Sequence, residues 1–351
     1  MSKIYKLLEI QDKHIWNDFI IESDFEFYSF LHSWEWGEIQ SKLGKDINRF
    51  GIYEQNTLIG VMLVLKVFAK RGNYYFIPHG PIIIGDFHEV FSEIFPKLLN
   101  QAKADSMDFI RLNSTVRNTQ KNKDKFEELG FKHAPMHEHA EDTHLLDIDI
   151  SEEELLGNMN SKDRYYINRA KKEGVQVRTS NDIDHIQILK DYHFKHAKRS
   201  DGKHNYSAFS EDFIDALYDR YGDSISTIST SHKGVVESII MTIQFGNRCV
   251  YYIAASNIIH KKFSPNYLCQ WSAIINAKNN GAKIYNFWGV SPDDNPEHPI
   301  AGVTKFKRKF AGYDYSLLHA QDFPITWKYY LNWMIETFRR KKRGYYYKKP
   351  E

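Results

Sequence analysis

The residues best suited to chemistry lie near the carboxyl end of the chain, between Gly289 and Gly312. The run Ala282–Trp288 alternates apolar and polar side chains, which predicts a half-buried strand with an acidic loop at its carboxyl end. Beyond that loop, Lys305–Phe310 has the sequence K-F-K-R-K-F and fits about two turns of a helix. Four positive charges on so short a helix would attract a phosphate-rich partner. The segment therefore predicts a site for a phosphate-bearing substrate.

The same segment resembles a motif of the Fem family of peptidoglycan-bridge peptidyltransferases. In that motif, an acidic loop is followed by H-P-L-A-G and then by F-K-x-x-F-G. The chain has H-P-I-A-G-V at residues 298–303, then Phe306-Lys307 and Phe310-Ala311-Gly312. Further stretches similar to the family are W-E-W-G from Trp34, P-H-G-P from Pro78, and the run Met159–Lys171 with Gly174-Val175 behind it. Taken in order, these stretches extend over most of the chain.

The resemblance implies an aminoacyltransferase that forms peptide bonds. Aminoacyl-tRNA would be the acyl donor, and the nucleophile would be an amino group on the stem peptide of a peptidoglycan precursor. That precursor would be UDP-MurNAc-pentapeptide or a lipid II-type molecule, and the product would belong to an interpeptide bridge. No cofactor is implied.

The resemblance also implies roles for individual residues. Phe306 and Lys307 would be the catalytic pair at the tRNA acceptor end. Lys307 would offset the charge of the tetrahedral oxyanion, and Phe306 would stack on the terminal adenine. The residues expected to bind tRNA are Lys305, Arg308 and Lys309, and those expected to bind substrate are Trp36, Lys42, Arg164, Asn168, Arg169, Arg199 and Lys203.

Ordinary structural roles stay open for several of these residues. Phe306 and Phe310 lie four positions apart and could simply anchor a surface helix. Arg164 and Asn168 share a helix face by the same spacing, so together with Arg169 they could either line a substrate channel or cap a domain interface. The cationic runs Arg164–Lys172, Lys305–Lys309 and Arg339–Lys349 could each be a solvated surface.

Three positions depart from the family pattern. Gln40 stands where family members can present a lysine to the precursor phosphate, and Lys42 is two residues further on. Asn113-Ser114 replaces an Asp-Pro, which removes a candidate carboxylate base. Asn205 stands where an arginine is expected. These departures leave the identity of the stem-peptide carrier open.

The order of predicted elements repeats once along the chain. In each half, two strands joined by a polar turn precede a third strand, a helix, a fourth strand and a short helix. The first set is Arg49–Tyr53, Leu58–Val67, Tyr74–Ile77, Phe87–Lys103, Asp108–Leu112 and Lys123–Leu129, and the second is Ser224–Ser229, Val235–Phe245, Cys249–Ala255, Tyr267–Asn279, Lys283–Phe287 and Thr304–Phe310. The repeat predicts an α+β fold of two tandem GNAT-like (acyl-CoA N-acyltransferase-like) domains, without a long coiled-coil arm.

We place the domain boundary near Ile150, after a predicted strand at Asp142–Ile150 and before a helix that Ser151 caps and that includes Met159. The first domain then covers residues 1–150, completed by a carboxyl-terminal helix within 320–351, and the second covers 151–319.

The final helix has apolar residues at helical spacing. They are Trp327, Tyr330, Leu331, Met334, Ile335 and Phe338. This spacing predicts that the helix folds back on a core. Peripheral contact with the inner membrane leaflet is the alternative, because a basic tail follows.

Composition excludes several classes. A chain of 351 residues suits two domains, and its 42% hydrophobic content can fill two cores. No apolar run is long enough to span a membrane and no signal sequence opens the chain, so we expect a soluble cytoplasmic protein. The net charge of +2 leaves nucleic-acid binding to local patches.

Neither the cysteines nor the histidines predict a metal site. Cys249 and Cys269 lack a partner at a ligand spacing, so we expect neither a disulfide nor zinc. Of the sixteen histidines, the closely spaced ones are His133, His137, His139 and His144. They do not have the helical H-E-x-x-H spacing of a hydrolytic zinc site.

Three classes of function remain open. The first is the tRNA-dependent aminoacyltransferase. The second is an N-acyltransferase of the same fold that takes a CoA or carrier-protein donor to another cell-envelope polymer, although neither Gly80–Gly85 nor Asn257–Asn266 has the glycine-rich turn that would hold the CoA pyrophosphate. The third is a duplicated fold that only binds. Lys307→Ala separates them, because it should abolish aminoacyl transfer but be silent in a binding module. The amino acid transferred and the oligomeric state stay open.

Overall fold

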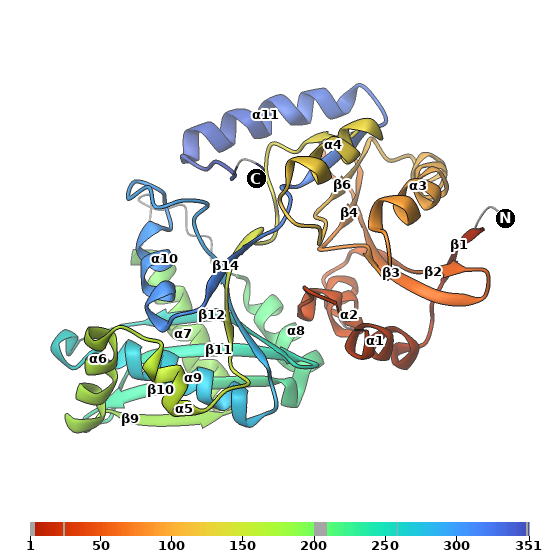
Figure 1. The fold of residues 1–351 in the computed structure, drawn as a ribbon. Coiled ribbons are helices and arrows are strands. Elements are labelled where there is room, and N and C mark those ends of the chain that lie inside the picture. Colours follow the sequence, from red (N-terminus) through yellow and green to blue (C-terminus); the bar gives the residue numbers. More distant parts are fainter. Residues whose placement is uncertain (1–3, 24, 200–208, 258, 349, 351) are drawn as a thin grey trace. The chain divides into compact units, whose positions relative to one another are not determined.

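A computed structural model describes residues 4–23, 25–199, 209–257, 259–348 and 350 of the chain (Figure 1). Lys203 and Asn205 lie outside these residues. The chain forms two compact units. Unit 1 comprises Met1–Asp142 and Ser316–Glu351, and unit 2 comprises Thr143–Tyr315. The sequence instead places the division at residue 150 and the return to the first domain at residue 320.

Unit 1 is built on a sheet with strand order β1-β2-β3-β4-β6-β15-β7, and β5 pairs with β3. The strands are β1 (Tyr5–Glu9), β2 (Asp46–Glu54), β3 (Thr57–Val67), β4 (Tyr74–Ile77), β5 (Ile82–Ile83), β6 (Phe109–Leu112), β7 (Lys132–His133) and β15 (Gln321–Pro324). The helices are α1 (Lys13–Glu22), α2 (Trp34–Lys42), α3 (Phe87–Ala104), α4 (Gln120–Glu128) and α11 (Lys328–Arg343). Phe91, Ile94 and Leu98 of α3 are buried in one core with residues of β2, β3 and β4.

Unit 2 is built on a sheet with strand order β14-β8-β13-β12-β11-β10-β9. The strands are β8 (Asp142–Asp147), β9 (Gln176–Ser180), β10 (Ile225–His232), β11 (Val235–Phe245), β12 (Arg248–Ser256), β13 (Ile284–Gly289) and β14 (Tyr313–Ser316). The α-helices are α5 (Glu152–Gly157), α6 (Ser161–Lys172), α7 (Ile183–Arg199), α8 (Glu211–Tyr221), α9 (Pro265–Asn279) and α10 (Ala301–Lys307). Ile240 of β11 packs in the core with α9, and because strand side chains alternate, Ile239 and Met241 face the other side.

The two sheets have the same order and polarity, which confirms the tandem GNAT-like fold. Each has an antiparallel meander followed by one parallel pair, β4 with β6 in unit 1 and β12 with β13 in unit 2. In each sheet the next strand, antiparallel to this pair, comes from a distant part of the chain. β15 follows unit 2 in sequence but pairs with β6, and β8 precedes the rest of unit 2 but pairs with β13. The sequence does not predict this exchange.

Local sequence explains most element boundaries. Asp12, Ser33, Asp86, Thr119 and Ser151 each accept a backbone N–H bond at the start of a helix. The side chain of Ser151 caps α5 as expected. That helix ends at Gly157, however, so the prediction that it includes Met159 is wrong. The chain turns and starts α6 at Ser161.

The prediction that the apolar side chains of the last helix fold back on a core is also wrong. The helix forms as α11, but the six apolar residues named above are all exposed, from 38% for Ile335 to 70% for Phe338. The side that packs on unit 1 instead carries Tyr329 and Asn332, which are buried, and Glu336, which pairs with Arg111. No helix among the described residues is long and apolar enough to cross a membrane.

Candidate functional site

The parallel strands β12 and β13 stay paired only at their beginnings. Their register covers three positions, from Arg248 opposite Ile284 to Val250 opposite Asn286. Beyond this point β13 becomes irregular, because Asn286 Oδ1 accepts the N–H of Trp288 at 2.7 Å and Trp288 has φ of 64°. The two strands therefore stop hydrogen-bonding to each other next to the acidic loop that follows β13.

Lys307 lies where these strands lose their pairing. Its Nζ donates to the carbonyl oxygen of Gly289 at 2.6 Å, at the end of β13, and lies 5.6 Å from the ring centre of Tyr251 on β12. The side chain is buried, with 6% exposure, and within the described residues no carboxylate forms an ion pair with it. Burial lowers the pKa of Lys307 from 10.5 to about 7. An amine with this pKa can be charged or neutral near physiological pH, so it can offset charge or exchange a proton.

The acidic loop is held against α10 by hydrogen bonds. Thr304 Oγ1 accepts the N–H of Ser291 at 2.7 Å, and the carbonyl oxygen of His298 accepts the N–H of Ala301 at 2.9 Å. A pocket of about 530 Å³ lies between loop and helix. Its wall includes Asp293, Asp294, Pro296, Gly302, Lys305 and Arg308. The pocket is large enough for a small polar group, and Lys307 is not part of its wall.

The aromatic pair of the motif divides into one core residue and one partly exposed residue. Phe310 is 1% exposed and packs against Phe287 with ring centres 5.9 Å apart, so it anchors the helix. Phe306 is half-buried, with its ring centre 5.5 Å from that of Tyr267. Anchoring the helix to the core therefore explains the presence of Phe310 fully, but that of Phe306 only in part.

The cationic run carries less free charge than its sequence suggests. Arg308 pairs with Asp294 and with Asp314, the latter at 2.6 Å. Lys309 donates to the Tyr267 hydroxyl and lies 3.7 Å from Asp163. Of the three residues expected to bind tRNA, only Lys305 is exposed and not half-buried, and in the described part of the chain it has no acidic partner. Two of the four charges are thus already balanced, and a third, Lys307, is buried.

The remaining predicted residues of unit 2 lie on helices. Arg164 of α6 donates from Nη1 to the carbonyl oxygens of Leu156 and Gly157, both at 3.1 Å, and so closes the end of α5. This is a capping role. Asn168 is exposed, and Arg169 lies 3.9 Å from Glu173. Arg199 ends α7, and Lys203 is outside the described residues.

Trp36 and Lys42 belong to unit 1. Trp36 is 3% exposed in α2 and packs edge-on against Phe30 and His139, which is the environment of a core residue. Lys42 is exposed in the last turn of α2, and Gln40 is buried. The surroundings of Trp36 and Lys42 assign neither residue to a substrate, so their substrate-binding roles stay predictions.

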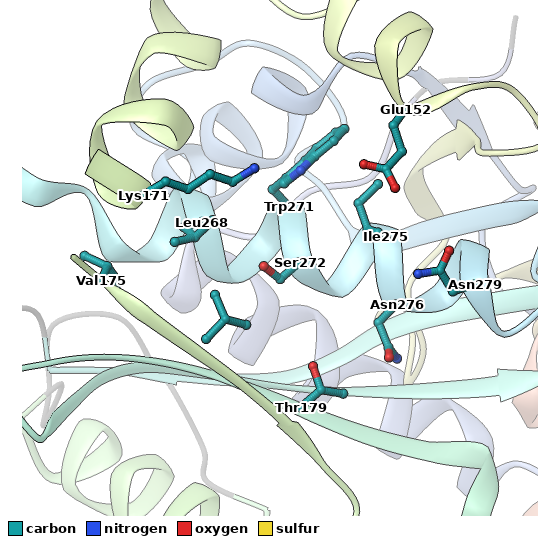
Figure 2. A pocket seen from close by; sticks show the side chains of 11 residues that line it. Glu152, Lys171, Val175, Thr179, Leu268, Trp271, Ser272, Ile275, Asn276 and Asn279 are labelled. Carbon is teal, nitrogen blue, oxygen red and sulfur yellow. The ribbon is translucent and has the colours of Figure 1, made fainter. Parts of the chain in front are cut away.

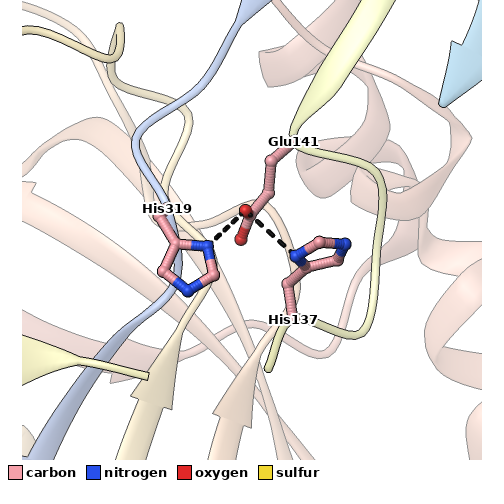
Figure 3. A group of neighbouring side chains, drawn as sticks. All are labelled: His137, Glu141 and His319. Carbon is pink, nitrogen blue, oxygen red and sulfur yellow. Dashed lines mark hydrogen bonds and ion pairs between the residues drawn. The ribbon is translucent and has the colours of Figure 1, made fainter. Parts of the chain in front are cut away.

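Asn113, another of the three departures, donates to a polar cluster in unit 1 that consists of His137, Glu141 and His319 (Figure 3). Asn113 Nδ2 donates to Glu141 Oε1 at 2.8 Å, and the N–H of Ala320 donates to the same oxygen at 2.7 Å. Glu141 Oε2 lies 2.6 Å from His319 Nδ1 and 3.2 Å from His137 Nδ1. The two histidines lower the pKa of Glu141 below its usual range, despite burial.

His137, Glu141 and His319 could hold a metal ion, because their ligand atoms lie within 4.8 Å of one another. Hydrogen bonding already accounts for the arrangement, since His319 Nε2 also bonds the carbonyl oxygen of Ala134 at 2.8 Å. The spacing of the histidines around His137 does not reveal this cluster, because His319 is far away in the chain. His144 takes no part, and its Nδ1 bonds Asp314 in unit 2 at 2.7 Å.

A second pocket in unit 2 was not predicted (Figure 2). It has a volume of about 420 Å³ and lies between β9 and α9, with Lys171 of α6 and Glu152 of α5 at its rim. Leu268, Trp271 and Ile275 form its α9 wall, and Thr179 projects from β9. None of its residues belongs to the motif around Lys307.

The two cysteines, Cys249 and Cys269, are both free and buried, and burial raises the pKa of each thiol to about 12.

Comparison with known proteins places this chain in a family. The model of the FemAB family matches residues 13–231 and 226–336. Aminoacyltransferase FemA from Staphylococcus epidermidis is 38% identical over 65 residues, which are 18% of this chain and 15% of that protein. FemA from Staphylococcus aureus strain MW2 is 38% identical over 61 residues, which are 17% and 14%. The chain thus aligns with only about a seventh of the length of these curated relatives.

Solved structures are similar over nearly the whole chain. A crystal structure of FemX has a TM-score of 0.80 and 17% identity, and the match covers 94% of this chain and 100% of that one. A tandem GNAT protein from the clavulanic acid biosynthesis pathway has a TM-score of 0.54 and 9% identity, over 92% and 98%. These likenesses concern the fold. The match of the family model over most of the chain shows that it is a member of the FemAB family.

Proposed function

We propose that this protein transfers an aminoacyl group from aminoacyl-tRNA to an amino group on the stem peptide of a peptidoglycan precursor. Membership of the FemAB family and local similarity to two FemA aminoacyltransferases support the reaction class. The observation that carries the proposal is the position of Lys307, a buried amine beside the ends of β12 and β13, where these two strands no longer pair with each other.

The reaction follows from ordinary acyl transfer. The acceptor nitrogen attacks the ester carbon of the aminoacyl-tRNA, and the carbonyl oxygen becomes a tetrahedral oxyanion. The C–O bond to the ribose then breaks, the ribose oxygen takes up a proton, and the nitrogen loses one as the peptide bond forms. The Lys307 ammonium would offset the oxyanion, an effect worth about 3–4 kcal/mol where a single donor has been removed from other enzymes.

The other predicted residues receive narrower roles. Lys305, exposed on α10, would contact the tRNA backbone, and Phe306, half-buried beside Tyr267, would stack on the terminal base. The pocket between the acidic loop and α10 carries both signs of charge, which suits a zwitterionic peptide or aminoacyl group. Arg308 and Lys309 would position α10 through their ion pairs and contribute little to tRNA binding.

We further propose that the acceptor is lipid-linked and that the protein works at the inner face of the membrane. UDP-MurNAc-pentapeptide is the alternative acceptor, and the two differ only in what carries the muropeptide.

The test is transfer of a radiolabelled amino acid from a pool of charged tRNA to purified muropeptide. UDP-linked and lipid-linked acceptors are run in parallel, each with and without RNase. We expect label in at least one muropeptide and its loss after RNase treatment. Label that survives RNase, or that comes instead from an acyl-CoA donor, would contradict the proposal. No label with any amino acid would do so as well.

A further inference from the structure

The helix α11 packs on unit 1 by a polar face. Tyr329 is 1% exposed and Asn332 is 7% exposed. Glu336 Oε2 accepts a bond from Arg111 Nη2 at 2.8 Å, and Arg111 is itself paired with Asp322 of β15. At about 100° per residue these positions share one side of the helix. The contact that fixes α11 therefore does not use the helix's apolar residues.

The opposite side of α11 is apolar and exposed. Trp327, Leu331, Met334 and Phe338 follow one another at spacings of four, three and four residues, and they are 69%, 44%, 56% and 70% exposed. Exposed apolar residues scattered singly are common, but a row along one helix face marks a surface that contacts something else. Because this side points away from the core of unit 1, its apolar character does not stabilise the fold.

The carboxyl end of the same helix is strongly basic. Arg339–Arg343 has the sequence R-R-K-K-R, and Lys341 and Lys342 are exposed. Glu336 is the only acidic residue in α11, and it is already paired with Arg111. Apolar side chains with tryptophan and tyrosine on one face, followed by clustered lysine and arginine, are typical of helices that lie in the interface of an anionic bilayer.

We propose that the outward face of α11, defined as Trp327, Leu331, Met334 and Phe338 with Lys341 and Lys342, binds the surface of an anionic lipid bilayer. The apolar side chains enter the boundary between headgroups and acyl chains, and the lysines contact lipid phosphates. A bilayer fits better than an acidic protein, because the apolar row and the basic end are continuous along a helix that is too short to span the membrane. This inference rests on the proposed function only for its purpose, which is access to a lipid-linked acceptor.

The test is cosedimentation of the full-length protein with vesicles of neutral phosphatidylcholine, with and without about 30% phosphatidylglycerol. We expect binding to the anionic vesicles that weakens as salt rises, together with a blue shift of tryptophan fluorescence. The double variant Trp327→Ser/Phe338→Ser should bind at least about tenfold more weakly, because two large side chains no longer enter the lipid. The double variant Lys341→Glu/Lys342→Glu should lose the preference for anionic lipid.

Control variants carry changes of the same kind elsewhere on unit 1. Phe68→Ser alters an exposed phenylalanine, at 61%, and Lys70→Glu/Arg71→Glu alters two adjacent exposed cations. Both should bind vesicles as the natural chain does. Absence of binding, or equal binding by the α11 variants, would overturn the proposal. A dimer that Trp327→Ser/Phe338→Ser abolishes, without vesicle binding, would assign the face to a second copy instead. Transfer to UDP-linked muropeptide without vesicles is a separate readout, so failure here is distinguishable from failure of the proposed function.

Discussion

At the scale of single residues, the sequence identifies Lys307 as a site residue but does not predict that its amine is buried. The F-K-x-x-F pattern singles it out, yet nothing in the pattern indicates that its amine is buried against the Gly289 carbonyl while its neighbours Arg308 and Lys309 have partners. Those properties depend on the irregular end of β13 and on Asp294, which lies 14 residues before Arg308 in the chain and meets it only after folding. The same limit applies to Glu141 and His319, which lie 178 residues apart in the chain.

The pKa of Lys307 predicts how transfer depends on pH. If its charge offsets the oxyanion, the rate should fall as pH rises through about 7, by about tenfold per unit well above it, because the protonated fraction declines. Lys307→Arg keeps the charge at all accessible pH values, so its rate, even if lower, should lose this descending limb. Single-turnover rates between pH 6 and 9 are the measurement. A limb near pH 7 that persists in Lys307→Arg would assign it to another group.

The same pKa predicts a dependence of stability on pH. The pKa of Lys307 is lower in the folded than in the unfolded chain, so between about pH 7 and 10.5 the unfolded chain binds more protons and stability rises with pH. Lys307→Met removes this contribution. The variant should be at least as stable as the natural chain at pH 7, and the difference between the two should shrink towards pH 10. Urea unfolding at several pH values checks this, and a variant that is much less stable at pH 7 would contradict it.

Arg111 is the buried charge on which unit 1 depends. Its guanidinium forms two 2.8 Å bonds with Asp322 directly across the strands and two further bonds with Glu336, which together join β6, β15 and α11. Arg111→Met would leave Asp322 buried without a cation, and we expect a loss of about 3–5 kcal/mol in the free energy of unfolding. Lys125→Met breaks an exposed pair with Glu128 and should leave stability unchanged. Equal free energies of unfolding for the two variants would show that the ion pairs of Arg111 do not stabilise unit 1.

At the scale of elements, most boundaries follow from the sequence. The predicted meanders, long helices and paired strands form within a few residues of where periodicity places them, because their apolar patterns match the faces they bury. Two errors have physical reasons. α5 stops at Gly157, where the Arg164 side chain takes up its last carbonyls. The apolar residues of α11 have helical spacing whether they face a core or not, so periodicity alone does not decide their direction.

Gly312 is the element-scale position that we expect to tolerate change least. It follows the helical turn of Arg308–Phe310 with φ of 95°, and a Cβ there would overlap the carbonyl oxygen of Leu145 on β8. Gly312→Ala should therefore cost at least about 1–3 kcal/mol of stability and disturb the pairing of β14 with β8. Gly157→Ala, where a Cβ meets nothing within 4 Å, should be neutral or slightly stabilising. Thermal unfolding compares them, and two equal melting temperatures would argue against a close approach at Gly312.

At the scale of the whole molecule, duplication was predictable and strand exchange was not. The repeated order of elements indicates two GNAT-like units, but it does not reveal that β15 completes the sheet of unit 1 and β8 that of unit 2. Both strands are short, and their own residues do not indicate which strand each will pair with. The partner depends on how the whole chain folds. Unit 1 consequently depends on residues that follow unit 2 in the sequence. The chemistry we propose belongs to unit 2, where Lys307 lies.

In the mechanism that we propose, Lys307 takes part directly in aminoacyl transfer. The most direct measurement is the amount of label that purified Lys307→Met transfers from charged tRNA to muropeptide, beside the natural chain and Lys305→Met. Lys305 is the exposed lysine two positions earlier on the same helix. We expect RNase-sensitive label with the natural chain, reduced but measurable label with Lys305→Met, and none above background with folded Lys307→Met. Label with Lys307→Met equal to that of the natural chain would contradict it.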